Sequence, residues 1–324
     1  TPPLPLSPSP RLSHSPTPLI IISPGFEASK KFLTYLAQHL TSHGFNVVAI
    51  EHPSVLQANQ RPINDLSQLL PPQELIDRPK DVQFVLDELG KRAPEANGAA
   101  RFNTQQVIVV GHSLGGYGAL ALAGGEVNLA ELRQFCQKNA VLQRSPADWL
   151  QCAGSQLSGN TLNLRDRRVV GAIALNPAVG QIFGKSGLMK VQTPTLMLTS
   201  TDDALTPTLS QQLQPFTQLP TPKYLITAIG ATHLSVSDST RFNPTMFSKT
   251  LVPEKLGNEV EGLRSVMRGV SLAFAQQFTP EAEKYKPFLT GGYAQSLSTQ
   301  AIPIRMNSEL PSSVTRILQL AGML

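Results

Sequence analysis

Short apolar runs alternate along this chain with amphipathic helical patterns, and this alternation restricts the fold more than any other feature. The runs are rich in Val, Ile and Leu, as in LIIIS at 19–23 and QVIVVG at 106–111. Runs that are apolar throughout are typical of strands buried on both faces. Strands alternating with helices predict an α/β fold with a mostly parallel sheet and helices on both faces. The other predicted strands span 46–50, 168–175, 195–200 and 223–229.

The helices that would cover this sheet are predicted from apolar residues at helical spacing. Val82, Val85, Leu86 and Leu89, for example, recur on one face of the segment 73–91. After Pro280 the pattern is weak and predicts nothing beyond packing. The other predicted helices of the main body span 30–43, 114–123 and 259–278.

Two segments depart from this alternation. Residues 1–18 contain seven prolines and no apolar periodicity, which predicts a linker or an extended arm. Residues 126–167 contain two amphipathic pieces separated by a turn at Ser145-Pro146. They predict a small helical insertion, a lid or cap above the C-terminal edge of the sheet. Residues 19–324 are expected to form one domain that carries this insertion.

Composition excludes two classes of partner. The 324 residues include 27 basic and 22 acidic side chains, for a net charge of +5. The basic residues are scattered, which is no footprint for a nucleic acid. No stretch reaches the ~18 consecutive apolar residues of a membrane span. We therefore expect no nucleic-acid partner and no membrane span, and leave peripheral contact with lipid open.

The motif Gly111-His112-Ser113-Leu114-Gly115 lies directly after a predicted strand and directly before a predicted helix. A G-x-S-x-G in this context places its serine on a sharp turn at the top of the sheet, exposed for nucleophilic attack. The alternative reading is a glycine-rich structural turn or a phosphate loop. The phosphate-binding patterns G-x-x-x-x-G-K-[ST] and G-x-G-x-x-G are absent, so we predict that Ser113 is a nucleophile.

A hydroxyl needs a base to accept its proton, and an acid usually orients that base. In this architecture the chain order is serine, acid, histidine. His233 is the only histidine after Ser113, and it follows the strand predicted over 223–229. Asp202 and Asp203 both follow the strand predicted over 195–200, and both qualify by position. We choose Asp203 as the acid.

The tetrahedral intermediate of such a reaction carries an oxyanion that needs backbone N–H donors. One candidate donor is the amide of Leu114, directly after the nucleophile. The second is the amide of Phe26, in the loop after the first strand, where Gly25 permits close approach. Pro24 has no N–H and cannot serve. A hydrophobic wall is the alternative role for Phe26.

The predicted insertion contains the two cysteines, Cys136 and Cys152, and the only tryptophan, Trp149. The cysteines are either reduced or joined in a disulfide, and their places on either side of a helical hairpin favour the disulfide. No histidine lies near them in sequence, so we predict no metal site. Apolar residues of the insertion, among them Leu150, Trp149 and Phe135, could roof an apolar substrate. Trp149 and Phe135 are candidate pocket residues, together with His112 beside the nucleophile.

The chain resembles the α/β-hydrolase superfamily, in the branch of dienelactone-hydrolase-like and platelet-activating-factor-acetylhydrolase-like esterases. The likeness spans 19 to about 233 and rests on SPGFEAS, EHPS, RPKDVQFVLDEL, GHSLGGYGALALAG, DALTP and GATH. The family's D-x-x-T-P segment favours Asp203 as the acid. Pro24 stands where that family has the histidine of H-G-x, and Ser113 replaces the cysteine of the dienelactone hydrolases proper. Chlorophyllases are similar in nucleophile and triad.

This resemblance implies a serine esterase or lipase with a Ser113-Asp203-His233 triad and no cofactor. We expect an ester with a long apolar chain as substrate. The alternatives are the phytyl ester of a chlorophyllase, the acyl chain of a phospholipase or acyltransferase, and a non-catalytic binding module. The cysteines and the proline-rich start resemble a cyanobacterial group of secreted hydrolases. A periplasmic or secreted location is therefore favoured over a cytoplasmic one.

Overall fold

The computed structural model describes residues 17–53, 70–91, 102–238 and 253–324. The proline-rich segment 1–18 lies almost entirely outside these ranges. A seven-stranded sheet forms the centre of the molecule, in the order β2-β1-β3-β6-β7-β8-β9. The first six strands are parallel and β9 is antiparallel to β8. The predicted α/β fold with a mostly parallel sheet is confirmed. The strands are β1 (Leu19–Ser23), β2 (Asn46–Ala49), β3 (Val107–His112), β6 (Val169–Leu175), β7 (Thr195–Ser200), β8 (Lys223–Ala228) and β9 (Ile304–Asn307).

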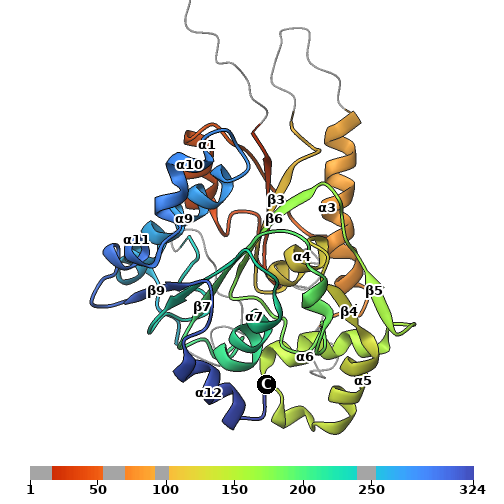
Figure 1. Ribbon diagram of the computed structural model, residues 1–324. Helices are drawn as coiled ribbons and strands as arrows, with labels where there is room; N and C mark the ends of the chain where they lie inside the picture. Colours follow the sequence, from red (N-terminus) through yellow and green to blue (C-terminus); the bar gives the residue numbers. More distant parts are fainter. Residues whose placement is uncertain (1–16, 54–69, 92–101, 239–252) are drawn as a thin grey trace, which may run out of the picture.

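Alternate residues of each central strand enter two separate cores, one on each face of the sheet. In β1, Leu19 and Ile21 pack into one core, whereas Ile20 and Ile22 pack into the other. This two-sided burial explains why the strands are apolar throughout. Figure 1 shows the two helical layers on opposite sides of the sheet. Helices α3 (Glu74–Lys91), α4 (Leu114–Leu122) and α7 (Gln214–Gln218) cover one face, and α1 (Thr34–Ser42) and α9 (Glu261–Gln276) cover the other.

The C-terminal segment contains more structure than its weak pattern indicates. Strand β9 pairs antiparallel with β8 at the edge of the sheet, from Leu225↔Asn307 to Ala228↔Ile304. Three short helices, α10 (Ala282–Tyr285), α11 (Gly291–Ser296) and α12 (Ser312–Leu320), flank this strand in sequence. The tail therefore completes the sheet edge as well as adding packing.

The segment 126–167 is not entirely helical. It begins and ends with two short strands, β4 (Glu126–Asn128) and β5 (Thr161–Asn163), which pair antiparallel in a separate ladder. Between them lie α5 (Leu129–Lys138) and α6 (Pro146–Cys152). Figure 1 shows both helices beyond the ends of the central strands, beside α7.

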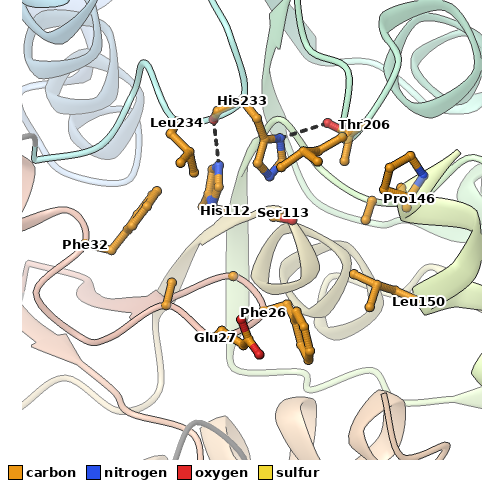
Figure 2. A pocket seen from close by; sticks show the side chains of 15 residues that line it. Phe26, Glu27, Phe32, His112, Ser113, Pro146, Leu150, Thr206, His233 and Leu234 are labelled. Carbon is orange, nitrogen blue, oxygen red and sulfur yellow. Dashed lines mark hydrogen bonds between the residues drawn. The ribbon is translucent and has the colours of Figure 1, made fainter. Parts of the chain in front are cut away.

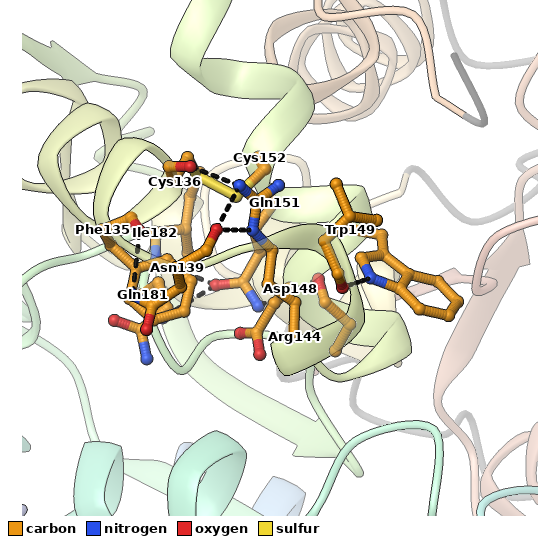
Figure 3. Close-up of a disulfide and its surroundings, with 12 residues drawn as sticks. Phe135, Cys136, Asn139, Arg144, Asp148, Trp149, Gln151, Cys152, Gln181 and Ile182 are labelled. Carbon is orange, nitrogen blue, oxygen red and sulfur yellow. Dashed lines mark hydrogen bonds between the residues drawn. A yellow bond between two sulfur atoms is a disulfide. The ribbon is translucent and has the colours of Figure 1, made fainter. Parts of the chain in front are cut away.

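A disulfide joins the two helices of this segment, as the cysteine positions favour. Cys136 in α5 is bonded to Cys152 at the end of α6, and their Cα atoms lie 5.8 Å apart (Figure 3). The bond closes a loop with a sequence separation of 16. Helix α6 starts with a capping box, in which Ser145 and Asp148 each accept a hydrogen bond from the other's backbone N–H. Both ends of this short helix are therefore fixed.

Candidate active site

Ser113 occupies the turn between β3 and α4, with a strained backbone of φ 53° and ψ −117°. A non-glycine residue adopts this region only where its surroundings impose it. Two glycines make the turn possible, because a Cβ on Gly111 would lie 2.0 Å from the Gly115 carbonyl oxygen and one on Gly115 would lie 2.2 Å from that of Ser23. The G-x-S-x-G motif is thus a steric requirement of this turn.

His233 lies in the loop after β8 and is held by Asp203. The Nδ1 atom of His233 lies 2.7 Å from Oδ2 of Asp203, and both side chains are buried. The Asp203 carboxylate also accepts hydrogen bonds from the amides of Leu205 and Thr206 and from the Thr206 hydroxyl. Since a carboxylate can only accept, His233 carries its proton on Nδ1 and presents Nε2 as a base.

The neighbouring aspartate has a different environment. Asp202 is half-exposed, and its carboxylate lies 3.4 Å from Nζ of Lys255. Asp203 instead points inward from the same loop to the imidazole of His233. The structure therefore brings Asp203, and not Asp202, against the candidate base.

Two side chains also hold the backbone of the candidate base. His112 donates from Nε2 to the His233 carbonyl oxygen over 3.0 Å, and Asn176 donates from Nδ2 to the same oxygen, also over 3.0 Å. The sequence analysis missed Asn176, which follows β6 with φ 43° and precedes a proline. A polar residue at that place, directly after a buried strand, is the signal that could have identified it.

Burial and hydrogen bonding act in opposite directions on His233. Burial opposes its protonation, but the charge and hydrogen bond of Asp203, with a contribution from Glu254, raise the pKa of His233 above its ordinary 6.5. Burial and the nearby His233 hold the pKa of His112 well below that value, so His112 is neutral. The two imidazoles, with ring centroids 4.5 Å apart, therefore differ in their readiness to accept a proton.

A cavity of about 70 Å³ lies over Ser113 and His233, and Figure 2 shows the His233 ring directed toward Ser113. Within the described residues the Ser113 hydroxyl makes no hydrogen bond, and nucleophile-to-base contacts are often loose before substrate binds. The rest of the lining is mostly apolar and comes from six regions of the chain. It comprises Gly25, Phe26, Glu27, Ala28, Phe32, His112, Pro146, Ala147, Leu150, Ala178, Leu205, Thr206 and Leu234.

Both predicted oxyanion donors lie beside this cavity. Leu114 is the first residue of α4, where backbone N–H groups lack a partner within the helix, and Phe26 lines the cavity wall. Among the residues that the structure describes, neither amide donates a hydrogen bond. A Cβ on Gly25 would lie 3.1 Å from Cβ of Ser113, so the loop carrying Phe26 passes directly beside the nucleophile.

Of the three candidate pocket residues, only His112 lines this cavity. Helix α6 turns Ala147 and Leu150 toward the site, and the helical rotation then turns the intervening Trp149 away. Trp149 lies beside the disulfide, where its Nε1 donates to the Val141 carbonyl (Figure 3). Phe135 is in α5 and lines a separate groove with Gly322 and Met323, which follow α12. Neither aromatic ring roofs Ser113.

Buried amides anchor α6 to the body of the molecule. Gln151 donates to Gln211 over 2.9 Å and accepts from the amides of Gln181 and Ile182, each at 2.8 Å (Figure 3). Gln211 in turn donates to Asp148 over 2.8 Å. Because buried polar groups are costly to unpair, this network fixes α6 as a wall of the cavity.

Two further properties concern the described ranges as a whole. Across 17–53, 70–91, 102–238 and 253–324, no group of three or more His, Cys, Asp or Glu side chains could hold a metal ion. None of the helices in these ranges combines the length and the apolar character of a membrane span.

A sequence model described as "Alpha/beta hydrolase family" matches residues 19–244, well over half of the chain. A search among curated proteins finds no match.

Proposed function

The chain belongs to the alpha/beta hydrolase family, and from this membership and the geometry of its site we propose that it hydrolyses carboxylic esters through an acyl-enzyme. One observation carries the proposal. Ser113, on a strained turn, shares a cavity with His233, whose Nδ1 is held by the buried Asp203. A nucleophile, a base and an acid that orients the base are the components of serine acyl transfer.

In the first step, Oγ of Ser113 attacks the ester carbonyl carbon and its proton passes to Nε2 of His233. We assign the amides of Leu114 and Phe26 as the donors that stabilise the negative oxygen of the tetrahedral intermediate. Collapse of the intermediate breaks the bond to the alcohol, which leaves with the proton from His233. Water, deprotonated by His233, then attacks the acyl carbon. The bond from that carbon to Oγ of Ser113 breaks, the carboxylic acid leaves, and His233 returns the proton to Oγ.

The cavity favours a short acyl group. A long apolar chain was expected because Leu150, Phe135 and Trp149 could have roofed it. Leu150 lies at the site, but the two aromatic residues do not. The cavity over Ser113 has a volume of about 70 Å³ and is partly open, with an apolar wall from Ala147 and Leu150. Such a volume accommodates an acyl group of roughly two to four carbons. We therefore propose that the substrate is an ester whose acyl group is short and uncharged.

A series of p-nitrophenyl esters of increasing acyl length tests this function. We expect turnover that requires Ser113, is fastest for acetate to butyrate and falls for longer chains. The control is Ser113→Ala, which retains the fold and removes the nucleophile. No Ser113-dependent turnover of any ester would contradict the hydrolase proposal, whereas an optimum at long chains would contradict the short acyl group alone.

A further inference from the structure

A buried arginine that does not line the cavity contacts the loop that carries Phe26. Arg78 lies in α3 and is 1% exposed. It donates from Nη1 to the Pro24 carbonyl over 3.0 Å and from Nη2 to the Gly25 carbonyl over 3.3 Å. Its Nε donates to the Glu74 carboxylate over 3.2 Å. The two Nη nitrogens therefore hold this loop to α3, while the bond from Nε to Glu74 fixes the guanidinium within the helix.

The contact with Gly25 determines where the next amide points. The Gly25 carbonyl and the Phe26 N–H belong to one planar trans peptide, in which they point in opposite directions. Because Arg78 holds the carbonyl on the α3 side, the Phe26 N–H is directed away from α3. Gly25 and Phe26 both line the cavity that contains Ser113 (Figure 2). Arg78, together with the Ala28 N–H that donates to the same carbonyl over 3.3 Å, thus fixes the plane of the peptide that offers the second oxyanion donor.

The same face of α3 holds the loop at a second point. Asp81, one turn after Arg78, lies 2.7 Å from Nδ1 of His52, and Nε2 of His52 lies 2.9 Å from Oγ of Ser23. Burial lowers the pKa of His52, which Asp81 opposes, so the ring is neutral and accepts from the Ser23 hydroxyl. Residues of α3 therefore hold three successive residues, the last of β1 and the first two of the loop: Arg78 contacts Pro24 and Gly25 directly, and Asp81 holds Ser23 through His52.

Helix α3 is itself fixed against α4 by an unusual contact. Pro79 lies inside the helix and has no N–H, so the carbonyl of Leu75, four residues earlier, lacks its helical partner. The buried hydroxyl of Tyr117 in α4 donates to this carbonyl over 2.7 Å. The helix that holds the loop is thereby held to the helix that begins at the nucleophile.

From these contacts we propose that Arg78 is a positioning residue for the oxyanion site, acting through the Gly25–Phe26 peptide. The role rests on the ester hydrolysis proposed above. It also gives a function to the RPKD sequence in α3 and to His52, which the mechanism itself does not use. A buried cation hydrogen-bonded to this carbonyl also polarises the peptide and strengthens its N–H as a donor.

The experiment compares Arg78→Met and Arg78→Lys with wild type in full-length protein, using p-nitrophenyl acetate. We expect Arg78→Met to lower kcat by about tenfold to a hundredfold, somewhat less than the loss from deleting an oxyanion donor outright. KM should change little, because the peptide acts on the transition state and not on substrate binding. Arg78→Lys keeps the charge and part of the hydrogen bonding, and should recover part of the rate.

A trifluoromethyl ketone provides a second readout, because it adds to the serine and places an oxyanion in the site. Its inhibition constant should rise in parallel with the fall in kcat/KM for both variants. A purely structural role would lower the melting temperature without this parallel change.

The matched control is Arg264→Met. Arg264 is also buried, and it likewise donates to a glutamate, Glu261, and to two main-chain carbonyls, those of Ser237 and Gly257. The Arg264→Met variant should be less stable than wild type and should retain the wild-type kcat. If Arg78→Met and Arg78→Lys also retain kcat and inhibitor affinity, the positioning role is overturned. Wild-type turnover that does not require Ser113 would instead overturn the proposed hydrolysis, and the role of Arg78 with it.

Discussion

Two sets of serine, histidine and aspartate lie within this molecule, and they differ in what surrounds the serine. In one, Ser23 is hydrogen-bonded to His52, which is hydrogen-bonded to Asp81. In the other, His233 is hydrogen-bonded to Asp203, and Ser113 stands beside them at a cavity without a hydrogen bond to the described residues. Both histidines carry their proton on Nδ1, because in each case an aspartate carboxylate accepts a hydrogen bond from that nitrogen.

The residues in contact with each serine account for the difference. Ser23 ends a buried strand and is 2% exposed, and its hydroxyl is already engaged with His52. Ser113 has φ 53° and a cavity above it, and within the described residues its hydroxyl makes no hydrogen bond and the two amides nearby donate none. Residue types and hydrogen-bond order alone do not make a catalytic triad. A strained turn, open space and candidate oxyanion donors separate the set that we propose to be reactive from the other one.

The largest expected effect comes from exchanging each serine for alanine. Ser113→Ala should lower kcat by roughly 10⁴- to 10⁶-fold, because it removes the nucleophile. Ser23→Ala removes one anchor of the loop and should lower kcat by no more than about tenfold, with a loss of stability of about 1–3 kcal/mol from the unpaired His52. Ester turnover and chemical unfolding measure both. A similar loss of kcat in Ser113→Ala and Ser23→Ala would contradict the proposed difference between the two sets.

The aspartates provide the next comparison. Asp203→Asn should lower kcat by roughly 10⁴-fold, because an amide no longer holds the His233 tautomer that leaves Nε2 free. Asp202→Asn, in the same loop but paired with Lys255 near the surface, should stay within about threefold of wild type. Steady-state kinetics of the two variants decide between them. The reverse order would show that Asp202 is the acid.

The cavity itself can be altered without touching the catalytic groups. Leu150→Ala enlarges the apolar wall, and should raise the ratio of kcat/KM for hexanoate to that for acetate by about tenfold, the scale set by a few methylenes in a pocket. Trp149→Ala, on the neighbouring residue that faces away from the cavity, is the control and should leave the ratio unchanged. An altered ratio in Trp149→Ala would place the acyl site elsewhere.

The smallest expected effect concerns pH. His233 must be neutral to act as a base, so kcat/KM should rise as the pH increases through its raised pKa, above the ordinary 6.5. Glu254 contributes to that raised pKa. Glu254→Gln should therefore move this limb of the profile to lower pH, by less than about one unit. A shift to higher pH would contradict this assignment of the charges around His233.

The sequence was sufficient where burial and strict geometry leave a clear pattern. The strands 19–23 and 195–200 were located to the residue, because strands buried on both faces are apolar throughout. The sharp turn at Ser113 was predicted because it requires glycine on both sides. Strand β9 was missed because it has only four residues and lies at the sheet edge, where Arg305 is exposed.

Other features depend on packing that one sequence does not reveal. Phe135 and Trp149 were placed at the site because the rotation of α5 and α6 relative to the sheet was unknown. Helix α6 turns Leu150, one residue later, inward instead. Arg78 escaped notice because an arginine in an amphipathic helix usually lies at the surface. Only the fold shows that it is buried against the loop that carries Phe26.

The most direct test of the distinction between the two serines is covalent labelling of the wild-type protein with a fluorophosphonate, followed by mass-spectrometric mapping of the modified peptide. The account predicts one adduct, on Ser113, which disappears in Ser113→Ala and persists in Ser23→Ala. An adduct on Ser23, or hydrolysis of p-nitrophenyl acetate that proceeds while Ser113 stays unlabelled, would contradict it.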